Sequence, residues 1–214
     1  MKQLIQFMSN IIIIGAGGLA SDMISYLENA GHQIKGILSD SKSDYDNLKT
    51  QIQYLGEIEK YSLSSDDLFI VAIGKNPNRA SVFLNFQQKG ACFYTFIHST
   101  AIICQNVNIG FGAIIGPYSV IGSNSEIGAG CFLNKFCSVG HDSIIEKNTI
   151  ISPFGFIGGN CYIKENSSLS LRGSILPGIS VGTNCVISAH CVVRKNIDDE
   201  TLYFSEKLIT KNKD

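Results

Sequence analysis

The most regular feature of this chain is an aliphatic residue that returns every six positions from Ala101 to Asn196 without a break. The third position of each hexad is Ile, Val or Leu, from Ile103 to Val193, and the first is almost always small. A helix repeats every 3.6 residues and a strand every two, so neither alone produces this pattern. A stack of similar coils does. We therefore predict a parallel β-solenoid whose interior holds the aliphatic residues, while the small residues let the chain turn each corner.

Three sides of six residues make an 18-residue coil, and adjacent strands lie about 4.8 Å apart. Residues 18 positions apart then stack, which places His141 against Gly159. We expect the glycine to leave room for a ligand atom beside the imidazole. Asp142 follows His141, and a carboxylate beside a neutral imidazole can orient it as a general base. His141 is therefore a candidate base, and the alternative is an exposed corner residue without a catalytic role.

The other histidines have no acidic neighbour in the sequence. We expect His32 to be solvated, His98 to pack at a domain junction, and His190 to lie at an outward corner. The separation of His141 and His190 is not a multiple of 18, so they are not expected to stack. This argues against a shared metal site of the kind a metal-dependent hydratase would need.

Before the repeat, short apolar runs alternate with helical patterns. The alternation predicts an α/β unit with a small parallel sheet, whose loops at the carboxyl ends of the strands face a ligand. Strands are expected at 10–14, 34–38, 68–73 and 92–97, helices at 21–30 and 80–89, and a polar linker at 41–53.

A glycine turn connects the first expected strand to the first helix. In Gly15-x-Gly17-x-x-Ala20 the bare backbone and the helix N-terminus can approach a diphosphate. Asp40 closes the second strand, where an acid can contact a ribose or a base, and Lys75 follows the third strand as a second wall. The alternative is a structural turn that binds nothing. The unit is short for a full dinucleotide fold, which favours a nucleotide-sugar over NAD.

Composition narrows the partners and the location. The net charge is −1 and charged residues make up 16%, so neither nucleic acid nor a membrane surface is indicated. No apolar run approaches the roughly 18 residues of a membrane span, and no secretory signal is evident. Met8 is an alternative start to Met1. Five of the seven cysteines occupy the small first position of a hexad, which indicates buried small groups and a reducing cytoplasm.

The segments IIIIGAGG, Ser39-Asp40, AIGKNPNR, FIHSTA and FLNKFCSVGHD, together with the hexads, resemble one family across residues 10–196. That family comprises the nucleotide-sugar N-acetyltransferases and the sialic-acid O-acetyltransferase-like proteins, which belong to the hexapeptide-repeat acyltransferases. Its best-understood member is the bacillosamine-pathway acetyltransferase. The resemblance implies a Rossmann-like nucleotide-sugar-binding domain over 1–97, a left-handed parallel β-helix over 98–196, and a tail over 197–214.

The resemblance also implies an activity: acetyl transfer from acetyl-CoA, without a metal, to the amine of a UDP-linked amino-deoxy sugar. It implies a homotrimer with active sites between subunits. By this resemblance His141 is the general base and Asp142 its acidic neighbour, and Asn134 lines the amino-sugar site. The residues implied for the nucleotide site are Gly15, Gly17, Gly18 and Asp40. Those implied for the acetyl-CoA groove are Gly159, Leu171 and Ala189.

Three departures from the family pattern concern the acceptor and the CoA contacts. Ile150 stands where many relatives have a second histidine, Leu19 stands in place of a histidine in the glycine loop, and the C-terminal G-x-P-A-K signature is absent. O-acetylation, transfer of another acyl group, and a non-catalytic nucleotide-sugar-binding or scaffolding role remain alternatives.

Overall fold

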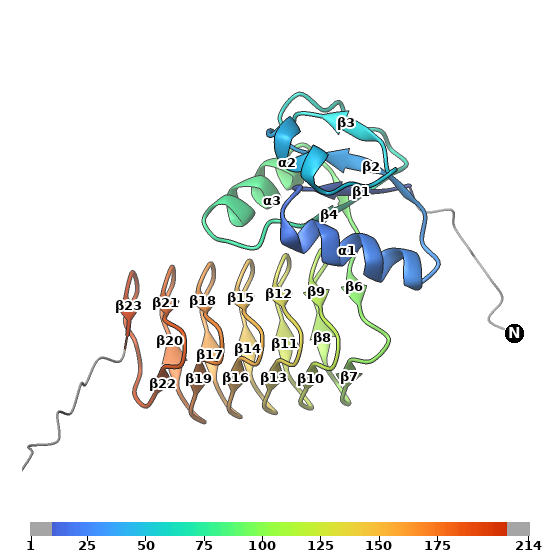
Figure 1. Cartoon of the computed structure of the whole chain (residues 1–214). Coiled ribbons are helices and arrows are strands. Elements are labelled where there is room, and N and C mark those ends of the chain that lie inside the picture. The colour runs from blue at the N-terminus through green and yellow to red at the C-terminus, as the bar shows by residue number, and fades with distance from the viewer. Residues whose placement is uncertain (1–9, 205–214) are drawn as a thin grey trace, which may run out of the picture.

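The structure, a computed structural model, describes residues 10–204 (Figure 1). A small α/β domain lies along one side of a long stack of coils. The choice between Met1 and Met8 as the start lies outside the described residues. No helix of the described part is long and apolar enough to cross a membrane.

The N-terminal domain is a five-stranded parallel sheet with strand order β3-β2-β1-β4-β5. Its elements are β1 (Asn10–Ile14), α1 (Gly18–Asn29), β2 (Ile34–Leu38), α2 (Lys42–Asn47), β3 (Tyr54–Gly56), β4 (Asp67–Val71), α3 (Asn78–Gln88) and β5 (Cys92–Phe93).

The central strand β1 is buried on both faces. Ile11 and Ile13 belong to the apolar cluster that contains Met23 and Leu27 of α1, whereas Ile12 packs in the cluster of α3. This explains the continuous isoleucine run, because a central parallel strand covered on both sides has no solvent-facing positions. The linker expected at 41–53 contains the short helix α2, and the strand expected at 92–97 is divided between two sheets.

The remainder of the chain is a left-handed parallel β-helix of two-residue strands, which form three flat faces. Paired strands are related by 18 residues up to β22, as in Val120↔Ser138, which is the coil length that the hexads predict, and the last pair, Val186↔Leu202, is related by 16. Face 1 comprises β6 (Phe96–Ile97), β9 (Ile114–Ile115), β12 (Phe132–Leu133), β15 (Ile150–Ile151), β18 (Ser168–Leu169), β21 (Val186–Ile187) and β23 (Leu202–Tyr203). Face 2 comprises β7 (Ile102–Ile103), β10 (Val120–Ile121), β13 (Ser138–Val139), β16 (Phe156–Ile157), β19 (Ser174–Ile175) and β22 (Val192–Val193). Face 3 comprises β8 (Asn108–Ile109), β11 (Glu126–Ile127), β14 (Ile144–Ile145), β17 (Tyr162–Ile163) and β20 (Ser180–Val181).

The stacked strands extend beyond both ends of the hexad range. Phe96 pairs with Ile114, and Leu202 pairs with Val186, so β6 and β23 add to the stack outside residues 98–196. Part of the segment expected as a tail therefore continues the β-helix, and residues after 204 lie outside the described range.

The interior of the β-helix is the apolar column that the repeat predicts. The third-position aliphatics from Ile115 to Val193 are buried in one continuous cluster. The hexad cysteines are free, buried thiols within this column, as expected from their position: Cys131, Cys137, Cys161, Cys185 and Cys191.

The N-terminal domain packs on face 1. The outward residues Ile114, Phe132 and Ile150 of this face are buried in the same cluster as the inner side of α1. Ile150, which stands where relatives have a histidine, is only 4% exposed. In this fold it is a core residue at the domain junction.

A buried guanidinium on α3 connects this helix to the β-helix through a hydrogen bond. Arg79 is fully buried, and its Nε donates to the carbonyl of Gly130 at 3.1 Å while its Nη1 donates to the carbonyls of Val71 and Ile73. Burial lowers the pKa of Arg79 to about 10, so the group stays protonated at neutral pH. Removal of this side chain would leave three carbonyls without their donor.

Candidate active site

The glycine turn lies at the carboxyl edge of the N-terminal sheet, as the sequence predicts. Gly15 has φ +111°, and a Cβ there would lie 2.9 Å from the carbonyl oxygen of Ala72, so only glycine fits. Gly17 is the N-cap of α1 without a side-chain cap, and Gly17 and Gly18 face open space. The first N–H groups of α1 therefore lack a side-chain partner and point to an anion site.

Two cavities lie at this edge and share Ala16 and Asp44 in their walls. The first, of about 430 Å³, is lined by Gly17 and Gly18 among others. The second, of about 370 Å³, is lined by Gly15 and Asp40 among others. Because the sequence predicts a nucleotide at this glycine turn, we call the two together the nucleotide crevice.

Of the two charged residues expected at this crevice, only Asp40 lines it. Asp40 lines the crevice, but its Oδ1 accepts a hydrogen bond of 2.9 Å from the backbone N–H of Ile58, so part of the carboxylate holds a loop. Lys75 is exposed and does not line either cavity; Asn78 and Ser81 of α3 form that wall instead. Side-chain contact of Lys75 with a nucleotide is thus not supported.

Asn134 lies at the corner between faces 1 and 2, close to the start of α1. Its Oδ1 accepts from the backbone N–H of Lys135 at 2.7 Å, and the Lys135 ammonium lies 3.5 Å from the Asp22 carboxylate on α1. The residue expected to line the amino-sugar site therefore borders the helix that opens the nucleotide crevice.

His141 and Asp142 lie together at the corner between faces 2 and 3. Nδ1 of His141 is 2.6 Å from Oδ2 of Asp142, and 64% of the imidazole side chain is exposed. The hydrogen bonds from His141 and Asn124 lower the pKa of Asp142. The carboxylate thus stays ionised and can hold the imidazole with its Nε2 available to a substrate.

Gly159 lies directly beside the imidazole. A Cβ at Gly159 would come within 2.8 Å of Nε2 and 3.0 Å of Cε1 of His141. The predicted stacking of the two residues is confirmed, but the space above the glycine is filled by the ring itself and not left open for a ligand. Only a glycine at position 159 leaves room for the imidazole in this place.

The corner of His141 lies opposite the N-terminal domain. The three faces form a triangular prism, the domain covers face 1, and His141 follows β13 of face 2 and precedes β14 of face 3. The N-terminal domain, which carries the crevice, lies along one side of the stack of coils (Figure 1). Within one chain the nucleotide crevice and His141 are therefore on opposite sides of the β-helix.

Face 2 lies between the two corners that carry the other expected contacts. Gly159 lies at the corner of His141, whereas Leu171 and Ala189 lie at the corner between faces 1 and 2, on the same edge of the prism as Asn134 but in later coils. The outward residues of face 2 include no charged side chain: Ile102, Val120, Ser138, Phe156, Ser174 and Val192. The outward residues of face 3, in contrast, include the charged Glu126.

An aromatic ladder, which the sequence reading missed, runs along the corner between faces 1 and 2. Tyr118, Phe136 and Phe154 stack with ring centroids 5.1 and 4.8 Å apart, and the Arg172 guanidinium lies 5.4 Å from the last ring. All three aromatic residues are exposed and have φ near +58°, a conformation unfavourable for bulky side chains. The 18-residue spacing is the signal that could have revealed the ladder.

The other histidines are placed away from this corner. His98 contacts Tyr26 edge-on and hydrogen-bonds Thr100 at the domain junction, as expected. His32 is half-buried and lies 2.8 Å from the hydroxyl of Tyr94, so it is not simply solvated. In residues 10–204 no three His, Cys, Asp or Glu side chains gather as a metal site.

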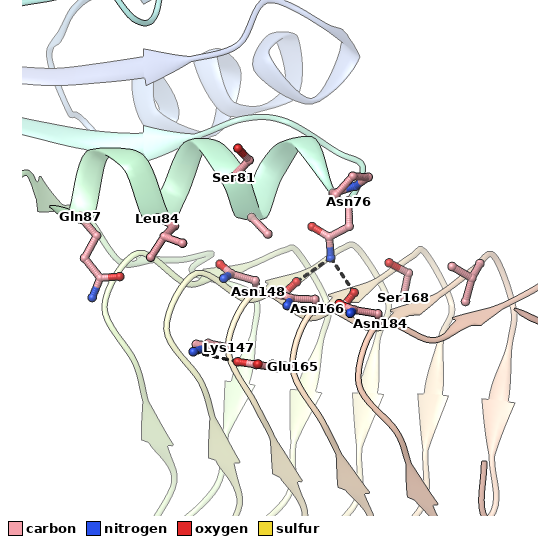
Figure 2. Close-up of a pocket in the computed structure, with 13 residues that line it drawn as sticks. Asn76, Ser81, Leu84, Gln87, Lys147, Asn148, Glu165, Asn166, Ser168 and Asn184 are labelled. Carbon is pink, nitrogen blue, oxygen red and sulfur yellow. Dashed lines mark hydrogen bonds and ion pairs between the residues drawn. The ribbon is translucent and has the colours of Figure 1, made fainter. Parts of the chain in front are cut away.

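A further cavity, of about 520 Å³, lies between α3 and the corner between faces 3 and 1 (Figure 2). Asn76 spans it and donates to the carbonyls of Asn148 at 2.8 Å and Asn166 at 3.1 Å. Its walls contain none of the residues that the sequence singles out. It is a feature of the domain junction that shares Ser81 with the wall of the nucleotide crevice and contains neither His141 nor Asp142.

Comparison with known proteins assigns the N-terminal domain and the fold. Residues 10–86 match the family model of the PglD N-terminal domain. A probable molybdopterin-synthase adenylyltransferase of Gracilaria tenuistipitata var. liui is 48% identical over 46 residues. This match spans 22% of the chain and only 13% of that relative.

Several solved structures share the whole architecture. PerB from Caulobacter crescentus, in complex with CoA and GDP-perosamine, is 24% identical with a TM-score of 0.77, over 89% of this chain and 91% of that one. The acetyltransferase domain of PglB from Neisseria gonorrhoeae FA1090, in complex with acetyl coenzyme A, is 24% identical with a TM-score of 0.80, over 89% and 93%. WeeI from Acinetobacter baumannii AYE is 18% identical with a TM-score of 0.78, over 89% and 93%. At these identities the likeness establishes the fold: an α/β domain joined to a left-handed β-helix.

Proposed function

We propose that this protein is an acetyl-CoA-dependent N-acetyltransferase that acts on the amine of a nucleotide-linked amino-deoxy sugar. The observation that carries the proposal is the His141–Asp142 pair, an exposed imidazole held at Nδ1 by a carboxylate at 2.6 Å. The nucleotide crevice supports the same activity, as does the likeness to one structure that holds CoA with GDP-perosamine and to another that holds acetyl coenzyme A.

In the proposed reaction, the neutral amine attacks the thioester carbonyl carbon of acetyl-CoA. Nε2 of His141 takes a proton from the amine nitrogen as the N–C bond forms, and Asp142 stabilises the imidazolium. The C–S bond then breaks and the CoA thiolate leaves. The thiolate accepts the proton from the His141 imidazolium and becomes a thiol. A general base of this kind contributes about 10²–10⁴-fold to the rate, and a backbone N–H can stabilise the oxyanion.

The assembly that fits this chemistry is a homotrimer with each site between two copies. The separation of the crevice and His141 on opposite sides of one prism supports it, since a neighbouring copy must supply the second half. The uncharged face 2 and the exposed aromatic ladder supply a surface for that neighbour. Gly159, Leu171 and Ala189, at the two edges of this face, are positioned to border a groove for acetyl-CoA.

The residues of the crevice also bear on the nucleotide. Gly15, Gly17 and Gly18 present backbone to a diphosphate, while Asp40 offers the remainder of its carboxylate to the nucleoside. We take a UDP-linked 4-amino sugar as the first candidate, and a GDP-linked one is tested beside it because PerB holds GDP-perosamine.

The test is turnover with acetyl-CoA and a panel of UDP- and GDP-linked amino sugars, followed by thiol release and by the mass of the product. We expect thiol release with at least one amino sugar, and a loss of about 10²-fold or more in His141→Ala. The control His32→Ala should keep the wild-type rate. Full activity in His141→Ala would overturn the assignment of the base.

The same panel separates the alternatives. Acetylation of the matching hydroxy sugar would indicate O-acetyl transfer. A ligand at about 100 times its Kd adds about 2.7 kcal/mol of stability. A thermal shift with the nucleotide sugar, no shift with acetyl-CoA, and no turnover would indicate a non-catalytic nucleotide-sugar-binding protein.

A further inference from the structure

An asparagine ladder ends at the proposed catalytic pair. Asn106, Asn124 and Asp142 are 18 residues apart, stack at the corner between faces 2 and 3, and have φ values of +57°, +59° and +56°. Nδ2 of Asn106 donates to Oδ1 of Asn124 at 3.0 Å, and Nδ2 of Asn124 donates to Oδ1 of Asp142 at 3.2 Å. The other carboxylate oxygen, Oδ2, faces Nδ1 of His141 at 2.6 Å.

The ladder determines which way each amide points. An asparagine amide can present either its oxygen or its nitrogen, and its hydrogen-bond partners decide between them. Because Asn106 donates to the oxygen of Asn124, the nitrogen of Asn124 is left to face the carboxylate. The reverse orientation would place an amide oxygen against a charged oxygen of Asp142.

The backbone supports the same contact. The N–H of Asp142 donates to the carbonyl of Ser123 at 2.9 Å, so the turn that contains Asn124 holds the turn of Asp142 twice. With one carboxylate oxygen held by Asn124, the other is directed at the imidazole. Which imidazole nitrogen carries the proton depends on the partner of the other one.

We infer that Asn124 is a positioning residue: through Asp142 it holds His141 in the Nδ1–H tautomer, which leaves Nε2 free to accept a proton. Asn106 acts one step further away, through the orientation of the Asn124 amide. The expected effect on kcat rests on the proposed function, whereas the expected effect on the His141 tautomer does not. The hydrogen bonds from His141 and Asn124, which lower the pKa of Asp142, agree with it.

The corner between faces 3 and 1 provides a matched comparison. Asn148, Asn166 and Asn184 have the same left-handed backbone and the same spacing, but no histidine follows this ladder. Asn166 has φ +60° and accepts from Asn76 through its backbone carbonyl, which any residue retains. Asn166→Gly therefore removes an amide from an equivalent backbone position far from His141.

The experiment compares Asn124→Gly with Asn166→Gly, because glycine adopts these φ values without strain. The tautomer of His141 is read from ¹⁵N NMR of histidine-labelled protein, on the alkaline plateau of the ring ¹⁵N shifts. His141→Ala identifies the signal. We expect the Nδ1–H form in the wild type and in Asn166→Gly, and a shift toward Nε2–H in Asn124→Gly.

Kinetics supply the second readout. We expect kcat to fall about five- to tenfold in Asn124→Gly, the size of one net hydrogen bond, while the KM values stay close to wild type. Asn106→Gly should act in the same direction and less strongly. Asn124→Asp, which places a carboxylate against Asp142, should lower kcat more than Asn124→Gly.

The outcomes separate this inference from the proposed function. An unchanged tautomer and an unchanged kcat in Asn124→Gly would overturn the role of Asn124, even if His141→Ala were inactive. A tautomer shift in a protein that acetylates none of the amino sugars would support the positioning role and count against the proposed activity. A loss of kcat in Asn124→Gly with an unchanged tautomer would mean that the residue does not act through His141.

Discussion

The imidazole of His141 packs directly on the backbone of Gly159 in the next coil. A Cβ at position 159 would lie 2.8 Å from Nε2, closer than van der Waals contact allows. The ring is held there from its other side by Asp142. A glycine and a carboxylate together thus define where the candidate base stands.

Gly159→Ala should displace the imidazole without unfolding the protein. The group that meets the new methyl is the end of a side chain with free space around it, so the ring can turn away at little cost in stability. A displacement of about 1 Å can reduce turnover by up to about 10²-fold. We expect a clear fall in kcat with a nearly unchanged Tm, measured by thiol release and by thermal unfolding.

The control is Gly74→Ala, because a Cβ at Gly74 meets nothing within 4 Å. It should leave both kcat and Tm near the wild-type values. Wild-type turnover in Gly159→Ala would show that the position of the ring over Gly159 does not matter for activity.

Asp67 predicts a pH dependence of stability. Its carboxylate is buried, which alone would raise its pKa, but hydrogen bonds from Lys35, the Ser64 N–H and Tyr61 outweigh burial and lower it. A lowered folded-state pKa stabilises the protein above the unfolded value of about 3.9, and this contribution is lost as pH falls through the folded-state pKa. Asp67→Asn should cost about 2 kcal/mol at neutral pH, and the difference from wild type should shrink below about pH 4.

Denaturant unfolding at several pH values measures this effect. The neighbouring Asp66 is exposed, so Asp66→Asn should change stability by less than about 0.5 kcal/mol at any pH. A constant difference between Asp67→Asn and wild type down to pH 3 would contradict the assigned ionisation.

Ile150→His restores the residue type that many relatives have at this place, and we expect it to destabilise the protein. Ile150 is buried between face 1 and α1, so a histidine would be a buried polar group without a partner. The cost should be about 3 kcal/mol, measured by denaturant unfolding. Ile144→His, at the same hexad position on exposed face 3, should cost less than about 0.5 kcal/mol. A gain in stability or turnover from Ile150→His would mean that this position belongs to the site and not to the core.

Phe156 and Tyr162 test which face carries the interface of the proposed trimer. They are 44% and 36% exposed and occupy the same hexad position on faces 2 and 3. Phe156→Lys should lower the molar mass measured by light scattering from that of a trimer to that of one chain, and activity should fall with it. Tyr162→Lys should leave both unchanged. A trimer in Phe156→Lys and dissociation in Tyr162→Lys would place the interface on face 3.

Local periodicity accounts for the parts of the fold that could be predicted. The aliphatic at the third position of every hexad and the small residue at the first position predict the three-sided coil. They suffice because each coil is stabilised by its immediate neighbours. The stacking of His141 on Gly159 follows from the same count. The Asn124–Asp142 contact has the same 18-residue spacing, and the count could have revealed it.

Weak or non-local signals account for what was missed. The short elements α2 and β3 lie in a polar segment where periodicity is too brief to detect. The participation of Lys75 in the crevice was expected from its loop alone, but the side chains of Asn78 and Ser81 form the wall. The ring of His141 fills the space over Gly159 because its hydrogen bond to Asp142 selects that rotamer, which spacing does not reveal.

The amino-acid sequence by itself determined the coil, its length, the buried column and the identity of the corner that carries His141. Only the tertiary structure decided that the N-terminal domain covers face 1, that Ile150 is core, and that the nucleotide crevice lies across the prism from the imidazole. The physical reason is range: a coil is set by residues 18 apart, whereas domain docking depends on which outward side chains of distant coils meet α1 and α3.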